Sequence, residues 1–280
     1  MERTRLPHVS RRAAIQSAAR YVRKLRPVLE SVRQVLPGLR ATRSPPTVVA
    51  AIIPCLDEED AIGPVVSSVL AQGVADVIVV DGASKDRTAE RATAAGARVV
   101  VEQRRGYGRA IQTGIAALRE DTDIIVFLDG DGSDPAEYIP ALIAPIAAGE
   151  VVFVLGSRIR GVREPKSLAP QQVAAGVMGA LLIRTIYGAR FSDLSPFRAI
   201  RRDALTRLGM REATYGWNLE MLMRVAAAGL PVQEIAVGQR RRIGGVSKVS
   251  GNLRAGLKAA AVLVITFCRL ALSLHRERRR

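Results

Sequence analysis

The chain has 280 residues, of which 48% are apolar, enough for one large α/β domain with a substantial core. Cys55 and Cys268 lie far apart and form no zinc or disulfide pattern, and His8 and His275 lie in the tails. The positions of the histidines argue against Ser-His-Asp hydrolysis and helical zinc-protease chemistry, so that any proton transfer or metal binding falls to carboxylates.

The net charge of +16 is concentrated at the two ends of the chain. Residues 1–46 carry eleven Lys or Arg and two Glu, residues 239–280 carry eleven basic residues and one Glu, and the part between them is slightly acidic. This distribution favours attachment to an anionic membrane surface over a groove for nucleic acid. Tails that only confer solubility remain the alternative.

Five short β-branched runs follow the basic N-terminal extension (1–46) and alternate with helical patterns. They are TVVAAII (47–53), DVIVV (76–80), ARVVV (97–101), DIIVFL (123–128) and VVFVLG (151–156). Each run is almost wholly apolar, which is typical of strands covered on both faces. The segment SKDRTAERATAAG (84–96) has the capping residues and the closing glycine of a helix. The order predicts an α/β fold with a mostly parallel central sheet and helices on both faces.

Charged segments follow four of these runs. They are PCLDEED, DGASKD and DGDGSD after the first, second and fourth runs, and SRIRG after the fifth. Ligands of an open parallel sheet bind outside the carboxyl ends of its strands, so we expect these segments to meet at one edge. Each alone has a simpler explanation, since Asp and Gly also make turns.

The DGDGSD segment is the strongest candidate for a metal site. Asp129 and Asp131 are two residues apart, so both carboxylates point to one side of an extended chain, and Gly130 and Gly132 leave room for a ligand. Such a pair suits Mg²⁺ or Mn²⁺, which could clamp a leaving diphosphate. Asp134, followed by Pro135, is interpreted as a helix N-cap.

The C-terminal helix expected over 253–280 is basic and amphipathic. Its apolar stretch AAAVLVITFC gives ten uncharged residues before Arg269, against roughly twenty for a membrane crossing. We therefore expect it to lie in the membrane interface, with Arg254, Lys258, Arg269 and the final RERRR facing phosphates, or else to pack on the domain.

A set of motifs in a fixed order resembles the family 2 glycosyltransferases, and within them the dolichyl- or polyprenyl-phosphate sugar synthases. The motifs are VVAAIIPCLDEED, VIVVDGASKDRT, FLDGDGSDP, VLGSRI, SDLSPFRAIRRDAL, YGWNLEM and RRRIGGVSK. The likeness covers about residues 47–252. It implies a GT-A (nucleotide-diphospho-sugar transferase) fold and the metal-dependent transfer of a hexose from a UDP- or GDP-sugar to a polyprenyl phosphate. Leu56, Asp57 and Gly82 depart from the common family pattern and leave the base undetermined.

The resemblance also implies roles for individual residues. The nucleotide sugar would be bound by Pro54, Asp57, Glu58, Asp81, Asp129 and Arg242, and the metal ion by Asp129 and Asp131. Arg158 would lie near the phosphates or the acceptor. Ser247 and Lys248 would close over the diphosphate and the acceptor phosphate. Gly106 and Gly108, in the RRGYG segment, fit a helix-entry turn as well as a ligand-binding loop.

The acceptor decides whether the reaction needs a base. A lipid monophosphate arrives ionised, whereas a hydroxyl acceptor needs a carboxylate to take its proton. Glu220 is the candidate for this base. The nearby Trp217 would either stack on the sugar or fill the core. We expect a cytoplasmic enzyme, peripheral at the inner face of the membrane. Two alternatives remain, a glycosyltransferase with a soluble hydroxyl acceptor and, more distantly, a non-catalytic nucleic-acid-binding protein. An aromatic content of 4% disfavours the latter.

Overall fold

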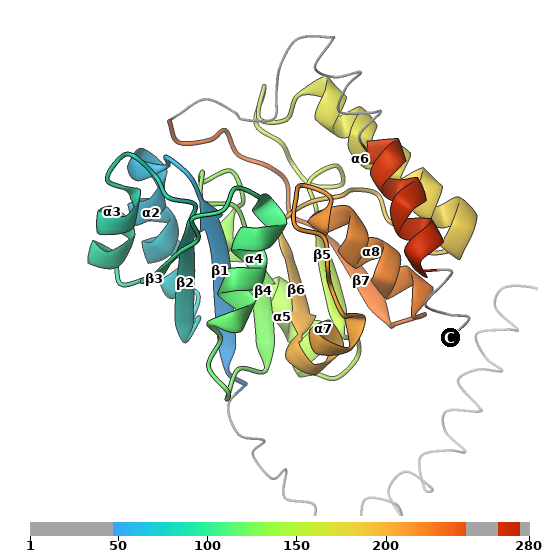
Figure 1. Cartoon of the computed structure of the whole chain (residues 1–280), viewed down its shortest axis with the longest axis horizontal. Helices are drawn as coiled ribbons and strands as arrows, with labels where there is room; N and C mark the ends of the chain where they lie inside the picture. Colours follow the sequence, from blue (N-terminus) through green and yellow to red (C-terminus); the bar gives the residue numbers. More distant parts are fainter. Residues whose placement is uncertain (1–46, 245–262, 275–280) are drawn as a thin grey trace, which may run out of the picture. The chain divides into compact units, whose positions relative to one another are not determined.

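A seven-stranded sheet forms the centre of the protein, with strand order β3-β2-β1-β4-β6-β5-β7 (Figure 1). The structure is a computed structural model that describes residues 47–244 and 263–274. Outside the described residues lie the predicted N-terminal extension, Ser247, Lys248, and all of the predicted C-terminal helix except 263–274.

Each predicted strand forms within a few residues of its expected bounds. The strands are β1 (Val49–Cys55), β2 (Asp76–Asp81), β3 (Arg98–Val101), β4 (Ile124–Phe127), β5 (Phe153–Ser157), β6 (Arg198–Arg201) and β7 (Val232–Ala236). Only β6 runs against its neighbours, pairing antiparallel with both β4 and β5. The sequence reading missed β6, which is four residues long with Arg at both ends, and β7, which lacks a continuous apolar run.

Helices cover the sheet on both faces, as predicted. They are α2 (Glu59–Leu70), α3 (Thr88–Ala94), α4 (Tyr107–Ala116), the short 3₁₀ helix η1 (Ala136–Tyr138), α5 (Ile139–Ala147), α6 (Pro170–Tyr187), α7 (Arg202–Leu208) and α8 (Trp217–Ala227). Residues 263–274 are also helical.

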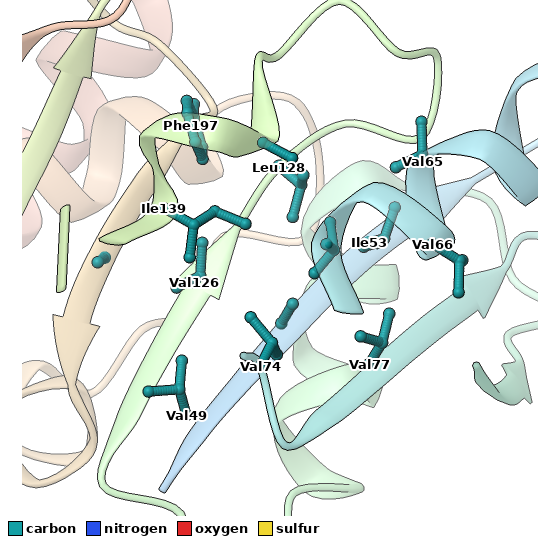
Figure 2. Packing of buried hydrophobic residues seen from close by; sticks show 14 of the residues in the cluster. Val49, Ile53, Val65, Val66, Val74, Val77, Val126, Leu128, Ile139 and Phe197 are labelled. Carbon is teal, nitrogen blue, oxygen red and sulfur yellow. The ribbon is translucent and has the colours of Figure 1, made fainter. Parts of the chain in front are cut away.

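Alternate residues of the central strands enter two hydrophobic clusters, one on each face. On one face, Val77, Val126 and Leu128 pack against α2 and α5, as Figure 2 shows. On the other face, Phe127 packs with Trp217 of α8 and with α4, α6, α7 and the 263–274 helix. Burial on both faces explains why these strands are almost wholly apolar. The parallel pairing of β1 with β2 and with β4 places the carboxyl ends of the three strands next to one another.

Candidate active site

The loops after β1 and β2 are tied together by hydrogen bonds. Asp57 has a positive φ of 50°, its N–H donates to Ser84 Oγ (2.9 Å), and its carboxylate accepts from the N–H of Lys85 (2.8 Å). The N–H of Glu58 donates to Thr88 Oγ1 (2.8 Å). Helix α3 begins at Thr88, inside the predicted segment 84–96, and the Ser84 side chain contacts the β1 loop.

Asp81 and Pro54 lie beneath these loops. Asp81 is buried at the end of β2 and accepts hydrogen bonds from both the N–H and the hydroxyl of Ser84. Pro54, half-buried in β1, stands opposite Val80 of β2. Asp81 thereby holds Ser84, whose hydroxyl in turn accepts the N–H of Asp57.

The DGDGSD loop brings three carboxylates together after β4. Asp131 Oδ1 accepts the N–H of Ser133 (3.0 Å), while Asp134 Oδ2 accepts the N–H of Asp129 (2.9 Å). The predicted N-cap role of Asp134 is wrong: η1 has no side-chain cap, and the Asp134 carboxylate turns back under the loop. No described residue donates to its buried Oδ1.

The two glycines of this loop serve packing and backbone geometry. A side chain at Gly130 would overlap the sulfur of Cys55, so the space predicted for a ligand is filled by that buried thiol. Gly132 has a φ of 77°, a conformation that glycine adopts without strain, and Ile243 lies against it.

The carboxylates of this loop repel one another, and a bound cation would relieve that repulsion. Burial raises the pKa of Asp129 well above its ordinary value, and the neighbouring carboxylates of Asp134 and Asp131 raise it further. Burial likewise raises the pKa of Asp134 to about 7. Within the described ranges no three acidic, His or Cys side chains are arranged as a ready metal cage. A pair of carboxylates nevertheless suits Mg²⁺ or Mn²⁺, which usually complete their coordination with water and phosphate.

These shifts predict a pH dependence for the metal-free protein. A carboxyl whose folded pKa is raised stabilises the fold fully below its unfolded value, near pH 4, and that stabilisation is lost as the pH rises through about 7. We expect the thermal midpoint in chelator to fall over this range, and to fall less in Asp134→Asn, which keeps an acceptor for the Asp129 N–H. Asp203→Asn, whose pKa is lowered, is the control. Equal slopes in Asp134→Asn and wild type would contradict the assignment.

Residues 239–244 lie against the acidic loop. The N–H of Ile243 donates to the carbonyl of Asp131 (2.8 Å), and the N–H of Arg240 to that of Ser133 (2.9 Å). Arg242 forms a salt bridge with Glu58 (2.7 Å), and its Nη1 lies 3.9 Å from Asp131 Oδ2. A cationic side chain therefore stands between the β1 loop and the acidic loop.

Arg158 is bound by a carboxylate of its own. Its guanidinium forms two hydrogen bonds of 2.8 Å with Asp193, which is fully buried. It also lowers the pKa of Asp129 and Asp134, although burial dominates for both groups. Arg158 thus pairs with Asp193 and also lies close enough to the acidic loop to reduce the repulsion between Asp129 and Asp134.

Glu220 and Trp217 are structural in this arrangement. Glu220 is fully buried on α8, where it accepts from the N–H groups of Arg211 and Glu212 and from Arg224 Nε (2.8 Å). A carboxylate so enclosed does not fit the catalytic-base role considered from the sequence. Trp217 is buried edge-on against Phe127, so it fills the core.

Sequence reasoning missed two groups behind the acidic loop. Tyr107, the first residue of α4, places its hydroxyl 3.4 Å from Asp129 Oδ1. Arg198 of β6 is buried and donates to the carbonyls of Ser195, Pro196 and Asn218, and burial lowers its pKa to about 10. The sequence gives no sign that a basic residue such as Arg198 is buried in a short strand. The RRGYG motif around Tyr107 was noticed in the sequence, but no role was assigned to its tyrosine.

Comparisons with known proteins agree with this architecture. The model of a family described as glycosyl transferase family 2 matches residues 50–209. An uncharacterized glycosyltransferase of Mycobacterium tuberculosis is 39% identical over 213 residues, covering 75% of this chain and 94% of its own. A dolichyl-phosphate hexose transferase of Haloferax volcanii is 34% identical, covering 70% and 84%. A crystal structure of glucosyl-3-phosphoglycerate synthase from M. tuberculosis, in complex with Mn²⁺, UDP-glucose and phosphoglyceric acid, superposes with a TM-score of 0.64 at 25% identity, covering 80% of each chain.

Proposed function

The chain belongs to the family 2 glycosyltransferases, and we propose that it transfers a hexose from a UDP- or GDP-sugar to a polyprenyl phosphate at a membrane surface. Its GT-A fold and its class as a glycosyltransferase agree with the sequence prediction. The finer assignment of donor, acceptor and residues is the proposal.

The donor side of the proposal assigns the loops at the sheet edge. Asp57, Glu58 and Asp81 would bind the base and ribose, and Asp129 and Asp131 would hold Mg²⁺ or Mn²⁺. When bound, the cation would neutralise charge on the departing nucleoside diphosphate. The structural relative that contains Mn²⁺ and UDP-glucose supports this assignment.

Arg242 would stabilise the negative charge on the leaving diphosphate during sugar transfer. An acceptor phosphate oxygen forms the new bond to the anomeric carbon, the bond from that carbon to the diphosphate oxygen breaks, and its electron pair goes to the leaving diphosphate. A guanidinium beside Asp131 is placed to meet that charge. We also assign Lys248 and Ser247, as the family resemblance implies, to the diphosphate and the acceptor phosphate.

The membrane side of the proposal rests on apolar side chains that are exposed on two helices of the same hydrophobic cluster. The 263–274 helix buries Phe267 and Leu270 in the cluster on the α8 face of the sheet, and Ile265 and Leu272 remain 67% and 61% exposed. On α6, drawn in yellow in Figure 1, the exposed apolar residues are Val177, Leu181 and Ile186. Together with the basic ends of the chain, these side chains suit the surface of an anionic bilayer.

One side of the 263–274 helix packs on the domain, as the second of the two predictions had it, and another side is exposed. Arg269, expected to face phosphates, pairs with Glu212 instead. No helix among the described residues is long and apolar enough to span a bilayer.

The enclosed carboxylate of Glu220 also favours a phosphate acceptor. A hydroxyl acceptor would need a base, and Glu220 was the candidate that the sequence offered. An ionised lipid phosphate needs none. The dolichyl-phosphate hexose transferase among the relatives supports the same choice.

A direct assay tests the proposal. The full-length protein would be incubated with Mn²⁺ and labelled UDP- or GDP-hexoses, in the presence of a polyprenyl phosphate in detergent, of 3-phosphoglycerate, or of no acceptor. We expect label to enter the organic phase only with the polyprenyl phosphate. Transfer to 3-phosphoglycerate alone would establish the second candidate, a soluble hydroxyl acceptor, which the resemblance to glucosyl-3-phosphoglycerate synthase favours.

Membrane attachment gives a separate prediction. Replacing Ile265 by Asp puts a charge on the exposed side of the 263–274 helix, and we expect the fraction that sediments with anionic liposomes to fall several-fold. Val101→Asp, which puts the same charge on the half-exposed edge strand β3, is the matched control and should sediment as wild type does. Equal sedimentation of all three proteins would contradict the proposed surface.

A further inference from the structure

The glycines of the RRGYG motif are explained by how the start of α4 docks on the segment before α8. The N–H groups of the second and third residues of α4 donate to the carbonyls of Thr214 and Ala213 (3.2 and 3.0 Å). A side chain at Gly106 or Gly108 would overlap this backbone, and Gly106 has a φ of 145°. The glycines therefore permit the close approach that places Tyr107.

Tyr107 is held from several sides at the acidic loop. Its hydroxyl donates to Asp129 Oδ1 (3.4 Å), and the side chain of Asn218 hydrogen-bonds the same hydroxyl. Its ring stacks on that of Tyr215, with centroids 6.1 Å apart. No described residue donates a hydrogen bond to the other carboxylate oxygen of Asp129, Oδ2.

The segment that carries Tyr215 is itself anchored at two helices. Glu220 of α8 accepts the N–H groups at its start, and Glu212 pairs with Arg269 of the 263–274 helix. The Glu212 carboxylate also accepts the hydroxyl of Thr214 (2.6 Å). These contacts hold the segment that docks against the start of α4. The start of α4 in turn places the Tyr107 hydroxyl beside the Asp129 carboxylate.

We propose that Tyr107 is a positioning residue that orients the Asp129 carboxylate for the metal ion, an inference that rests on the proposed metal-binding role of Asp129. A carboxylate without a fixed partner rotates about its Cβ–Cγ bond. The donor at Oδ1 restricts that rotation and leaves Oδ2 for the cation. Groups that orient a metal ligand in this way typically change metal affinity by about 10- to 100-fold when they are removed.

The test measures metal binding apart from turnover. Mn²⁺ affinity would be determined from the electron paramagnetic resonance signal of free Mn²⁺, in the presence of UDP, for wild type, Tyr107→Phe and Asp131→Asn. UDP binding in chelator would be measured alongside by calorimetry. Tyr138→Phe, on η1, is the matched control for loss of a phenol hydroxyl.

We expect Tyr107→Phe to weaken Mn²⁺ binding about tenfold or more, with UDP binding in chelator and the thermal midpoint close to wild type. Wild-type Mn²⁺ affinity in Tyr107→Phe, with binding lost in Asp131→Asn, would overturn the role of Tyr107 and leave the proposed metal site standing. Wild-type affinity in both variants would overturn both. If Tyr107→Phe is unstable, Asn218→Ala removes the second partner of the hydroxyl and should weaken Mn²⁺ binding in the same direction; no change there would count against the proposal.

Discussion

Replacing Asp131 by asparagine is expected to abolish the metal-dependent binding of the nucleotide sugar while leaving the fold intact. The amide oxygen of asparagine can still accept the N–H of Ser133, which Asp131 Oδ1 accepts at 3.0 Å. What is lost is the negative charge, which makes a carboxylate a much stronger ligand for a hard divalent cation than a neutral amide oxygen. Removing the ligand itself should exceed the roughly 10- to 100-fold loss caused by removing a group that only orients one.

Calorimetry with UDP- and GDP-sugars, in Mn²⁺ and in chelator, measures this effect. Asp121→Asn is the control, because Asp121 is exposed and pairs only with Arg119 among the described residues. In Asp131→Asn the difference between Mn²⁺ and chelator should vanish. If that difference persists at the wild-type size, Asp131 is no metal ligand and the donor side of the proposal fails.

Removing the Glu220 carboxylate is expected to produce the largest loss of stability. Glu220→Ala takes the buried partner from Arg224 and removes the acceptor for the N–H groups of Arg211 and Glu212. Breaking a buried ion pair from one side typically destabilises a protein by about 3 to 5 kcal/mol. Urea unfolding measures the change, and Glu150→Ala, at an exposed position, should stay within about 0.5 kcal/mol of wild type.

The same residue separates the two acceptor hypotheses. Glu220→Gln retains the shape and one acceptor oxygen, so enough folded protein should remain for an assay below its melting temperature. If Glu220 supports the fold only, turnover per folded molecule should stay within a few-fold of wild type. Complete loss of turnover in a folded Glu220→Gln would instead favour a base and a hydroxyl acceptor.

The fold was readable from local pattern to a large extent. Five apolar runs separated by helix-length segments admit few arrangements, because crossovers between parallel strands are right-handed and short. The strand ends then bring PCLDEED, DGASKD and DGDGSD to one edge, whatever the details of packing. Strand β6 was not predicted, because a four-residue segment with Arg at each end resembles a loop as long as the burial of Arg198 is unknown.

The candidate site was readable only in part. Asp129 and Asp131 follow from their spacing, but the same logic assigned Asp134 to a helix cap, and its carboxylate in fact accepts the N–H of Asp129. Gly130 looked like room for a ligand and proved to be room for Cys55. Asp134 had two chemically reasonable partners, and the one that it contacts is not the helix end next to it in sequence. The neighbour of Gly130 comes from the end of β1, which no local pattern indicates.

By itself, the sequence determined the order of β1 to β5 with the helical segments between them, the family, and the edge of the sheet at which the acidic residues gather, since all of these depend on neighbours along the chain. Only the tertiary structure decided that Glu220 is buried and that Arg158 forms a salt bridge with Asp193. It also decided that the Tyr107 hydroxyl hydrogen-bonds to Asp129. The reason is physical: the burial and the partners of a charged or polar group are set by residues distant in sequence, and no local pattern records them.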